Sequence, residues 1–239
     1  MTQKSTVQSM KKAVEFLKDN PWSRTPFFWL TFPSLGLLKP VQYLVLRELM
    51  DCDSVLDLGC GRHSMVPIIS SRTKTVGVEF FKPHFEEAVR SGRHKEYLNL
   101  DITKADFPDK SFDAVILLDV IEHLSKEEGL SLLKKMERWA RKKIIIFTPN
   151  GFLHQDGYDE NPLMAHQSGW TAADMRGLGF KVFGVRGFKF LKKGDHHDHD
   201  QERPKIPMSE SLVDLTQLFT YYWSGQAFQI FCVKNLESR

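Results

Sequence analysis

Hydrophobic residues along the chain form short continuous runs separated by segments in which they recur every three or four positions. The runs lie at about 53–58, 75–78, 97–100, 112–118 and 143–148, and most are followed at once by a glycine or an acidic residue. Continuous apolar runs of this length are typical of strands buried on both faces of a parallel sheet. The periodic segments are typical of amphipathic helices. The pattern therefore predicts an α/β fold built from strand–helix units.

Capping residues and glycines indicate where the helices begin and end. Helices are expected over 41–50 and 83–91, and another over 171–178, after which Gly179 ends the pattern. A longer helix begins after Ser125, where Glu128 completes a capping box. Four of its side chains are expected to face the core: Leu130, Leu133, Met136 and Trp139.

The regular alternation lapses after residue 150, and two insertions are expected there. The first, at about 151–169, is a long polar loop, and loops of this length inside a compact domain are usually functional or disordered. The second, at about 192–224, includes an amphipathic stretch at 209–223. Strands are expected at 180–190 and 227–233, the last as an edge strand of the sheet.

The first 50 residues are interpreted as a helical segment that precedes one domain over 51–239. An amphipathic helix is predicted at 6–18, and an aromatic- and proline-rich stretch follows at 21–38. Aromatic residues are mostly used for burial, so this stretch is read first as packing onto the domain. A lid over the acceptor pocket is the second interpretation.

Composition narrows the class of protein. The 239 residues include 33 Lys and Arg against 30 Asp and Glu, a net charge of +3, which does not favour a nucleic-acid partner. Three cysteines without a CxxC pair indicate reduced thiols and a cytoplasmic location. No signal peptide is visible, and the apolar run at 27–32 is too short to span a membrane.

A glycine turn, Gly59-Cys60-Gly61, follows the first strand, and Ser64 could cap a helix after it. The third glycine of the dinucleotide fingerprint would stand at Ser64, so its absence argues against NAD and FAD. Glu79 ends the second strand about 20 residues after Gly59, the spacing expected for a carboxylate that accepts from ribose hydroxyls. A nucleotide site at the carboxyl edge of the sheet is therefore predicted.

These segments resemble the class I S-adenosylmethionine-dependent methyltransferases of the small-molecule kind (type 11/12 domain). The matching residues lie at 55–61, 77–79, 99–102 and 112–124, in that order along the chain. The resemblance implies an α/β fold with a doubly wound, Rossmann-like sheet of seven strands. The sheet would be mostly parallel, in an order of roughly 3-2-1-4-5, with an antiparallel edge hairpin strand.

The resemblance also assigns cofactor roles to eight residues. Asp57, Gly59 and Gly61 would surround the methionine part of S-adenosylmethionine, and Asp119 would lie near its methyl end. Glu79 would take the ribose hydroxyls.

The remaining three residues would hold the base. Asp101 would accept from the adenine amino group, Ile102 would give backbone contacts to the ring, and Phe80 would stack on it. Glu79 and Asp101 could instead be solvated carboxylates at strand ends. Two carboxylates at successive strand ends beside Gly-x-Gly favour the cofactor interpretation.

Two histidines are candidate catalytic residues, His123 and His166. His166 lies in the long loop, where a neutral imidazole could take a proton from the acceptor. A loop histidine bonded to backbone is the alternative interpretation. His123 is read as a helix-cap or pocket histidine.

No metal is expected. Small-RNA 2′-O-methyltransferases of this superfamily hold a divalent ion with a Glu-x-x-Glu-His pattern and a later histidine. Here Asp119, Glu122 and His123 would need His154 or His166 as the last ligand. The sequence Ile-Glu-His-Leu also occurs in many small-molecule methyltransferases that bind no metal. The acidic-histidine tract at 195–200 is interpreted as a solvated loop.

The sequence thus predicts methyl transfer from S-adenosylmethionine to a small or medium polar acceptor. Oxygen is favoured as the methylated atom, because the Asn/Asp-Pro-Pro-Tyr motif of base N-methyltransferases is absent. One alternative is an RNA ribose 2′-O-methyltransferase with a divalent metal, for which the basic run within 134–143 could serve. The other is a non-catalytic nucleotide-binding or scaffold protein.

Overall fold

The computed structural model describes residues 40–62, 64, 66, 73–157, 161–192, 213 and 216–236. The predicted helix at 6–18, the aromatic stretch at 21–38 and the tract at 195–200 lie outside these residues. Residues 209–212, 214 and 215 of the amphipathic stretch and residues 65 and 67–72 after Ser64 do so as well. No helix within the described ranges combines the length and apolar character needed to cross a membrane.

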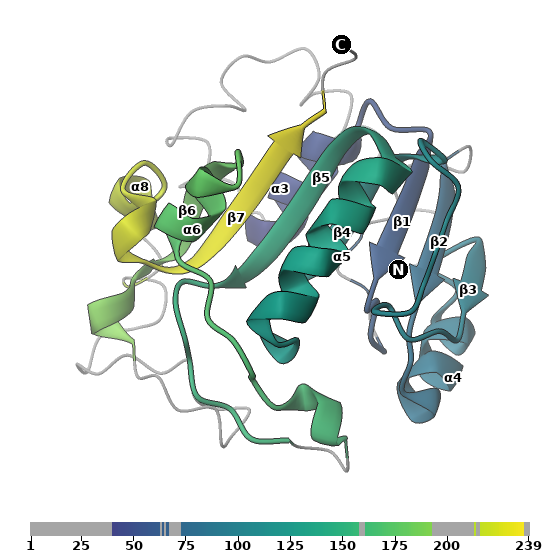
Figure 1. Ribbon diagram of the computed structural model, residues 1–239. Helices are drawn as coiled ribbons and strands as arrows, with labels where there is room; N and C mark the ends of the chain where they lie inside the picture. Colours follow the sequence, from purple (N-terminus) through teal and green to yellow (C-terminus); the bar gives the residue numbers. More distant parts are fainter. Residues whose placement is uncertain are drawn as a thin grey trace, which may run out of the picture.

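Within the described residues, seven strands form one sheet in the order β3-β2-β1-β4-β5-β7-β6 (Figure 1). Strands β1 to β5 pair in parallel, and β7 is antiparallel to both of its neighbours, β5 and β6. This confirms the predicted doubly wound sheet with an antiparallel hairpin. The strands are β1 (Ser54–Leu58), β2 (Lys74–Val78), β3 (Glu96–Leu98), β4 (Phe112–Leu118), β5 (Ala140–Pro149), β6 (Lys181–Phe188) and β7 (Ala227–Asn235).

The prediction that the last strand lies at the edge is wrong, because β6 is the edge and β7 lies between β5 and β6. Every residue from Ala227 to Val233 is buried, whereas Lys181, the first residue of β6, is exposed. Pairing on both sides removes β7 from the sheet edge, and packing on the sheet buries both of its faces, so its apolar run is continuous. The chain leaves β5, forms the edge with β6 and then returns into the space between them.

Helices cover both faces of the sheet (Figure 1). Helix α3 (Pro40–Leu49) packs behind it on alternate strand residues such as Val55 and Ile145. Helix α5 (Lys126–Trp139) packs in front, on residues such as Leu56 and Ile144. Successive side chains of a strand point to opposite faces, so each strand supplies both cores. The other helices are α4 (Lys82–Ser91), α6 (Ala172–Gly177) and α8 (Gln217–Thr220).

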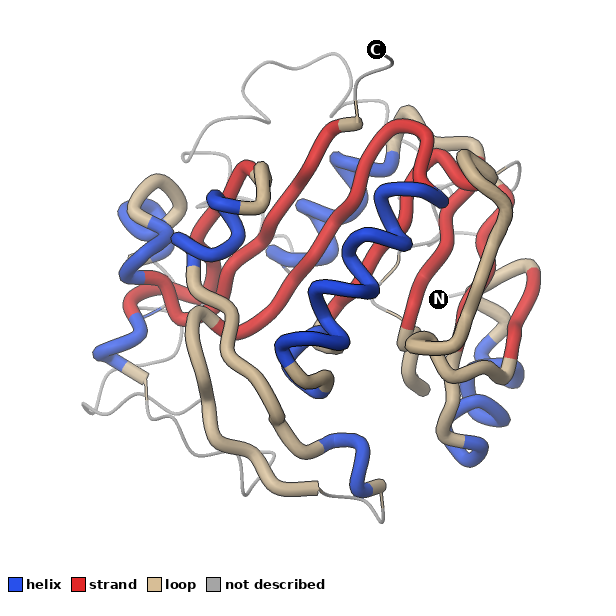
Figure 2. The backbone as a smooth tube through the Cα atoms, viewed as in Figure 1, coloured by secondary structure: helices blue, strands red, loops and turns tan. Residues whose placement is uncertain are grey.

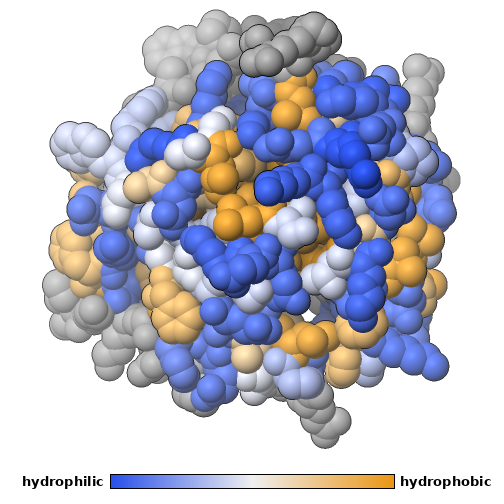
Figure 3. Space-filling model, viewed as in Figure 1, coloured by the Kyte–Doolittle hydropathy of each residue, from blue (hydrophilic) through white to orange (hydrophobic). Residues whose placement is uncertain are grey.

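The face viewed in Figure 1 is largely hydrophilic, and its apolar side chains are seen as separate patches near the middle (Figure 3). Leu130 on α5 belongs to this surface, being 36% exposed, so its predicted core position is wrong. The buried residues of α5 are Gly129, Leu132, Leu133, Met136 and Trp139. Residues three apart on a helix are displaced around its axis by about 60°. The four predicted positions are each three apart and so do not stay on one face, and the first of them, Leu130, lies outside the core.

The capping box of α5 is confirmed. Ser125 Oγ accepts from Glu128 N, and Ser125 N donates to the Glu128 carboxylate at 3.0 Å. Ser125→Ala is expected to lower the free energy of unfolding by about 1 kcal/mol, because one amide of the first turn loses its partner. Urea denaturation measures this. Glu127→Asp, in the same turn, keeps the charge and should change stability by less than about 0.5 kcal/mol; an equal loss would contradict the capping role.

Candidate functional site

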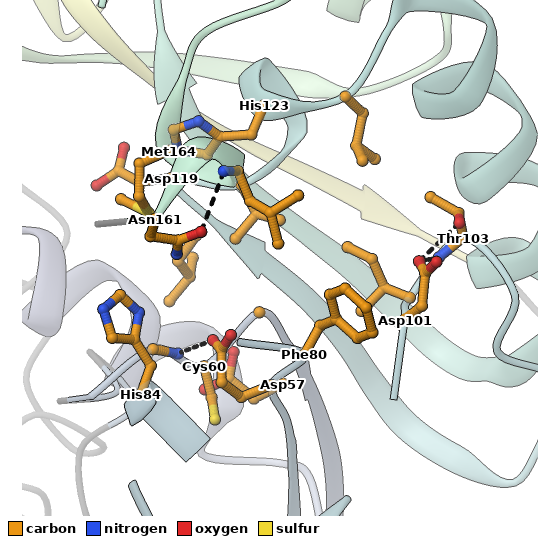
Figure 4. Close-up of a pocket in the computed structure, with 18 of the residues that line it drawn as sticks. Asp57, Cys60, Phe80, His84, Asp101, Thr103, Asp119, His123, Asn161 and Met164 are labelled. Atoms are coloured by element: carbon orange, nitrogen blue, oxygen red, sulfur yellow. Dashed lines mark hydrogen bonds between the residues drawn. The ribbon is translucent and has the colours of Figure 1, made fainter. Parts of the chain in front are cut away.

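The carboxyl ends of β1, β2 and β4 open on a cavity of about 680 Å³ (Figure 4). This is the edge at which open α/β sheets place their ligands. All eight residues predicted to bind the cofactor line it: Asp57, Gly59, Gly61, Glu79, Phe80, Asp101, Ile102 and Asp119. The structure thus brings together residues that are spread over more than 60 positions of the chain.

The glycine turn forms one wall of the cavity. Gly59 and Gly61 have φ values of +71° and +59°, which glycine adopts without strain. The amides of Gly59 and Cys60 both donate to Val78 O, at 2.8 and 2.9 Å, and this ties the turn to β2. A Cβ on Gly59 would lie 2.6 Å from Val120 Cγ2, whereas one on Gly61 would meet no described atom within 4 Å. Gly61 therefore leaves bare backbone beside open space.

Glu79 joins the glycine turn to the end of β2. Its carboxylate accepts from Gly61 N at 3.0 Å and from Phe81 N at 2.8 Å. Burial raises the pKa of this carboxyl above its usual value, although backbone bonds from Phe81, Gly61 and Phe80 oppose the rise. A carboxylate offers about four acceptor positions. These bonds therefore leave acceptor capacity on Glu79, which lines the cavity.

Asp57 is held by two contacts that the sequence analysis did not predict. Ser64 Oγ donates to Asp57 Oδ2 at 2.6 Å, and His94 Nε2 lies 3.1 Å from the same oxygen. His94 is buried and fits only because residue 77 is glycine, where a Cβ would approach the imidazole to 2.6 Å. His94 lies outside the motifs between α4 and β3, so no local pattern signals its contact with β1.

The far end of the cavity combines an aromatic ring with an acid. Phe80 is 51% exposed at its rim, and Ile102 is buried. Asp101 Oδ1 accepts from Thr103 N at 3.0 Å and Thr103 Oγ1 at 2.7 Å. Partial burial acts to raise the pKa of Asp101, but these bonds and Lys104 bring it below its usual value. A flat apolar ring beside a charged acceptor is a suitable environment for adenine.

Two acidic groups lie close together where β4 ends. Asp119 has a φ of +53° and lines the cavity, and burial raises its pKa to about 7. Glu122, in the short helix η3 (Ile121–His123), is buried and accepts from Thr148 Oγ1 at 2.9 Å. Burial and the neighbouring charge of Asp119 raise the pKa of Glu122 well above its usual value.

The loop after β5 is fastened to η3 through its backbone. Gln167 N and Ser168 N donate to Glu122 O at 2.8 and 3.1 Å, and Gln167 Nε2 donates to His123 O at 2.8 Å. Two described stretches of this loop run side by side below the sheet (Figure 2), joined by the bond from His166 N to Gln155 O. The predicted long loop is therefore ordered against the site in its described part.

The two candidate catalytic histidines contact each other, with ring centroids 4.8 Å apart. His123 lines the cavity, and His166 is not among the residues that do. His166 Nδ1 lies 2.6 Å from Leu153 O, which matches the alternative of a backbone-bonded loop histidine. Burial and the neighbouring His166 lower the pKa of His123 to about 4. His123 is therefore not a base with a pKa near neutrality, and His166 does not line the cavity.

Residues 56–147 match the family model described as a methyltransferase domain. The match covers less than half of the chain, and it agrees with the sequence resemblance to the class I S-adenosylmethionine-dependent methyltransferases. The matched segment runs from β1 to β5 and so includes every strand end that lines the cavity.

Curated relatives match the chain over a limited region. (S)-coclaurine N-methyltransferase of Thalictrum flavum subsp. glaucum is 29% identical over 115 residues, which are 44% of this chain and 30% of that protein. Probable tRNA methyltransferase 9B of Mus musculus is 33% identical over 85 residues, 35% of this chain and 18% of that protein. The chain thus spans less than a third of the length of these relatives.

A solved structure agrees over nearly the whole chain. The plantazolicin methyltransferase BpumL, in complex with S-adenosylhomocysteine, superposes with a TM-score of 0.51 and 15% identity. The superposition covers 95% of this chain and 90% of that chain. At this identity the likeness concerns the fold alone.

Proposed function

We propose that the protein transfers a methyl group from S-adenosylmethionine to a small or medium polar acceptor, with oxygen as the methylated atom. The observation that carries the proposal is the gathering of eight predicted cofactor residues around one cavity. Its volume of about 680 Å³ is within the range of small-molecule sites. The bare backbone at Gly61 and the remaining acceptor capacity of Glu79 fit this cofactor.

The residues of the cavity divide into two groups by the work they would do. When bound, the cofactor supplies a methyl group on a positively charged sulfur. Glu79 and Asp101 would hold its ribose and its adenine, so that the methyl group keeps one position. Leu163, Met164 and Gln167 line the cavity from the loop after β5 and would hold the acceptor there and exclude water.

The basic run within 134–143 does not support the RNA alternative. Arg138 bonds Asp106 and also Asp109, and Arg141 and Lys142 both lie near Asp113. These cations are paired within the fold and are not gathered beside the cavity. A polyanionic partner would need free cations there. The relatives named as N-methyltransferases act on nitrogen, so the choice of oxygen rests on the sequence at the end of β4.

Three cysteines also fit the predicted cytoplasmic location, which we include in the proposal. Cys52, Cys60 and Cys232 are all unpaired and buried. Burial raises the pKa of each thiol, that of Cys52 to about 12. Such thiols react slowly and remain reduced in a reducing compartment.

The proposal is tested with the full chain by calorimetry and by labelling. S-adenosylhomocysteine is expected to bind and NAD is not. Incubation with methyl-labelled S-adenosylmethionine and a cell extract is expected to place label in the small-molecule fraction, and prior nuclease treatment should leave that label unchanged. Binding of NAD alone would overturn the cofactor assignment, and label confined to nuclease-sensitive material would overturn the acceptor class.

A further inference from the structure

Three side chains beside the cavity place metal-binding atoms close together. Glu122, His123 and His166 each offer one ligand atom, and these atoms lie within 4.8 Å of one another. Two of them come from η3 at the end of β4, and the third comes from the loop after β5. More than 40 residues of chain separate them, so the fold and not local spacing creates the group.

The two imidazoles are oriented by backbone carbonyls. His123 Nδ1 lies 3.2 Å from Ala165 O, and His166 Nδ1 lies 2.6 Å from Leu153 O. A carbonyl can only accept, so a ring that bonds one of these carbonyls donates from Nδ1, and Nε2 is then the nitrogen able to bind a metal. This is the tautomer that binds metals, and a backbone carbonyl on the other nitrogen is the usual support of a metal-binding histidine.

The carboxylate is fixed in the same way. Thr148 Oγ1 donates to Glu122 Oε2, and the amides of Gln167 and Ser168 donate to Glu122 O. The last two bonds hold the loop that carries His166 against η3. The three ligand groups are therefore fixed in position by bonds made through other atoms, as a preformed site requires.

The charge balance around Glu122 also favours a cation. Glu122 is buried, and its carboxylate accepts from the neutral Thr148 hydroxyl. No salt bridge of Glu122 with a lysine or arginine is found among the described residues, whereas Arg186 acts on the nearby Asp119. A buried acidic group is normally paired or coordinates a metal. Two imidazoles and a carboxylate are ligands suited to first-row transition metals and less to Mg²⁺ or Ca²⁺.

We propose that Glu122, His123 and His166 bind one divalent transition-metal ion, such as Zn²⁺ or Mn²⁺. Because His123 lines the cavity, the remaining coordination positions would face the acceptor, where a hydroxyl oxygen is the suitable ligand. That role in acceptor binding rests on the proposed function. The sequence alone led us to expect no metal and left His154 and His166 equally placed. The structure favours His166, since His154 is exposed and faces Asp156.

The proposal is tested by titrating the full chain with Zn²⁺ and, in parallel, with Mn²⁺. The background carries H196A, H197A and H199A, because the tract at 195–200 could bind the same ions. One ion per chain is expected for one or both metals. His123→Ala and His166→Ala should each weaken binding at least tenfold, and His154→Ala is the matched control that should leave it unchanged. Zn²⁺ should also raise the melting temperature of the background protein but not that of the His166→Ala variant.

The outcomes separate this proposal from the proposed function. Absence of a bound ion in the background protein, or equal losses in His154→Ala and His166→Ala, would overturn the metal site. Affinity for S-adenosylhomocysteine is measured on every variant as a check of folding, and His166→Gln replaces His166→Ala if the latter does not bind it. Loss of the ion with retained S-adenosylhomocysteine binding supports the assigned ligands. A background protein that binds the ion but not S-adenosylhomocysteine would overturn the proposed function alone.

Discussion

Replacing Gly59 with alanine is expected to lower the free energy of unfolding by about 2–4 kcal/mol, because two unfavourable effects add. The first is the φ of +71°, which costs an L-residue about 1–2 kcal/mol. The second is contact of the new Cβ with Val120 Cγ2 at 2.6 Å, a side chain with little freedom to move. Urea denaturation of the full chain measures the loss.

Gly61→Ala is the matched control. Its φ of +59° is similar, but its Cβ would meet no described atom within 4 Å. It should therefore lose only the conformational part, about 1–2 kcal/mol. Equal losses in the two variants would show that Val120 moves aside and that close packing does not explain the glycine at 59.

Replacing Glu79 with alanine is expected to reduce the affinity for S-adenosylhomocysteine by about tenfold to a hundredfold. Hydrogen bonds to a charged group contribute about 1.5–3 kcal/mol, and each 1.4 kcal/mol is a factor of ten in affinity. The variant loses the proposed ribose acceptor. It also loses the bonds from Gly61 N and Phe81 N that hold the glycine turn in place. Titration calorimetry at fixed pH and salt measures the change.

Glu87→Ala controls for the charge alone. Glu87 also lines the cavity, but it is partly exposed and faces Arg62 at 3.8 Å. Its replacement should change the affinity less than threefold. If the two variants weakened binding equally, the specific role of Glu79 would be contradicted and a general effect of negative charge would explain both results.

The parallel part of the fold and the cofactor half of the site could be predicted from the sequence because their determinants are local. A strand buried on both faces shows a continuous apolar run, as in β4, whose seven residues are all buried. Parallel strands place their carboxyl ends at one edge. Residues such as Glu79 and Asp101 therefore had to converge once the strands were recognised.

What the sequence did not reveal depends on contacts between distant segments. The position of β7 follows from which partner it pairs with, and an apolar run does not specify a partner. The buried approach of His94 to Asp57 requires the loop before β3 to fold back onto β1. Likewise, His154 and His166 occupy the same polar loop. The bonds from residues 167 and 168 to η3 bring His166 close to Glu122.

The way in which the loop after β5 is attached to η3 has a consequence for how acceptor preference changes between related proteins. The attachment uses the backbone of residues 165, 167 and 168 and the side chains of Gln167, Ser168 and Trp170. Leu163 and Met164, which face the cavity from this loop, are not needed to fasten it. Evolution or design can therefore exchange these two side chains to select a different substrate, while the half of the pocket that recognises the methyl donor stays as it is.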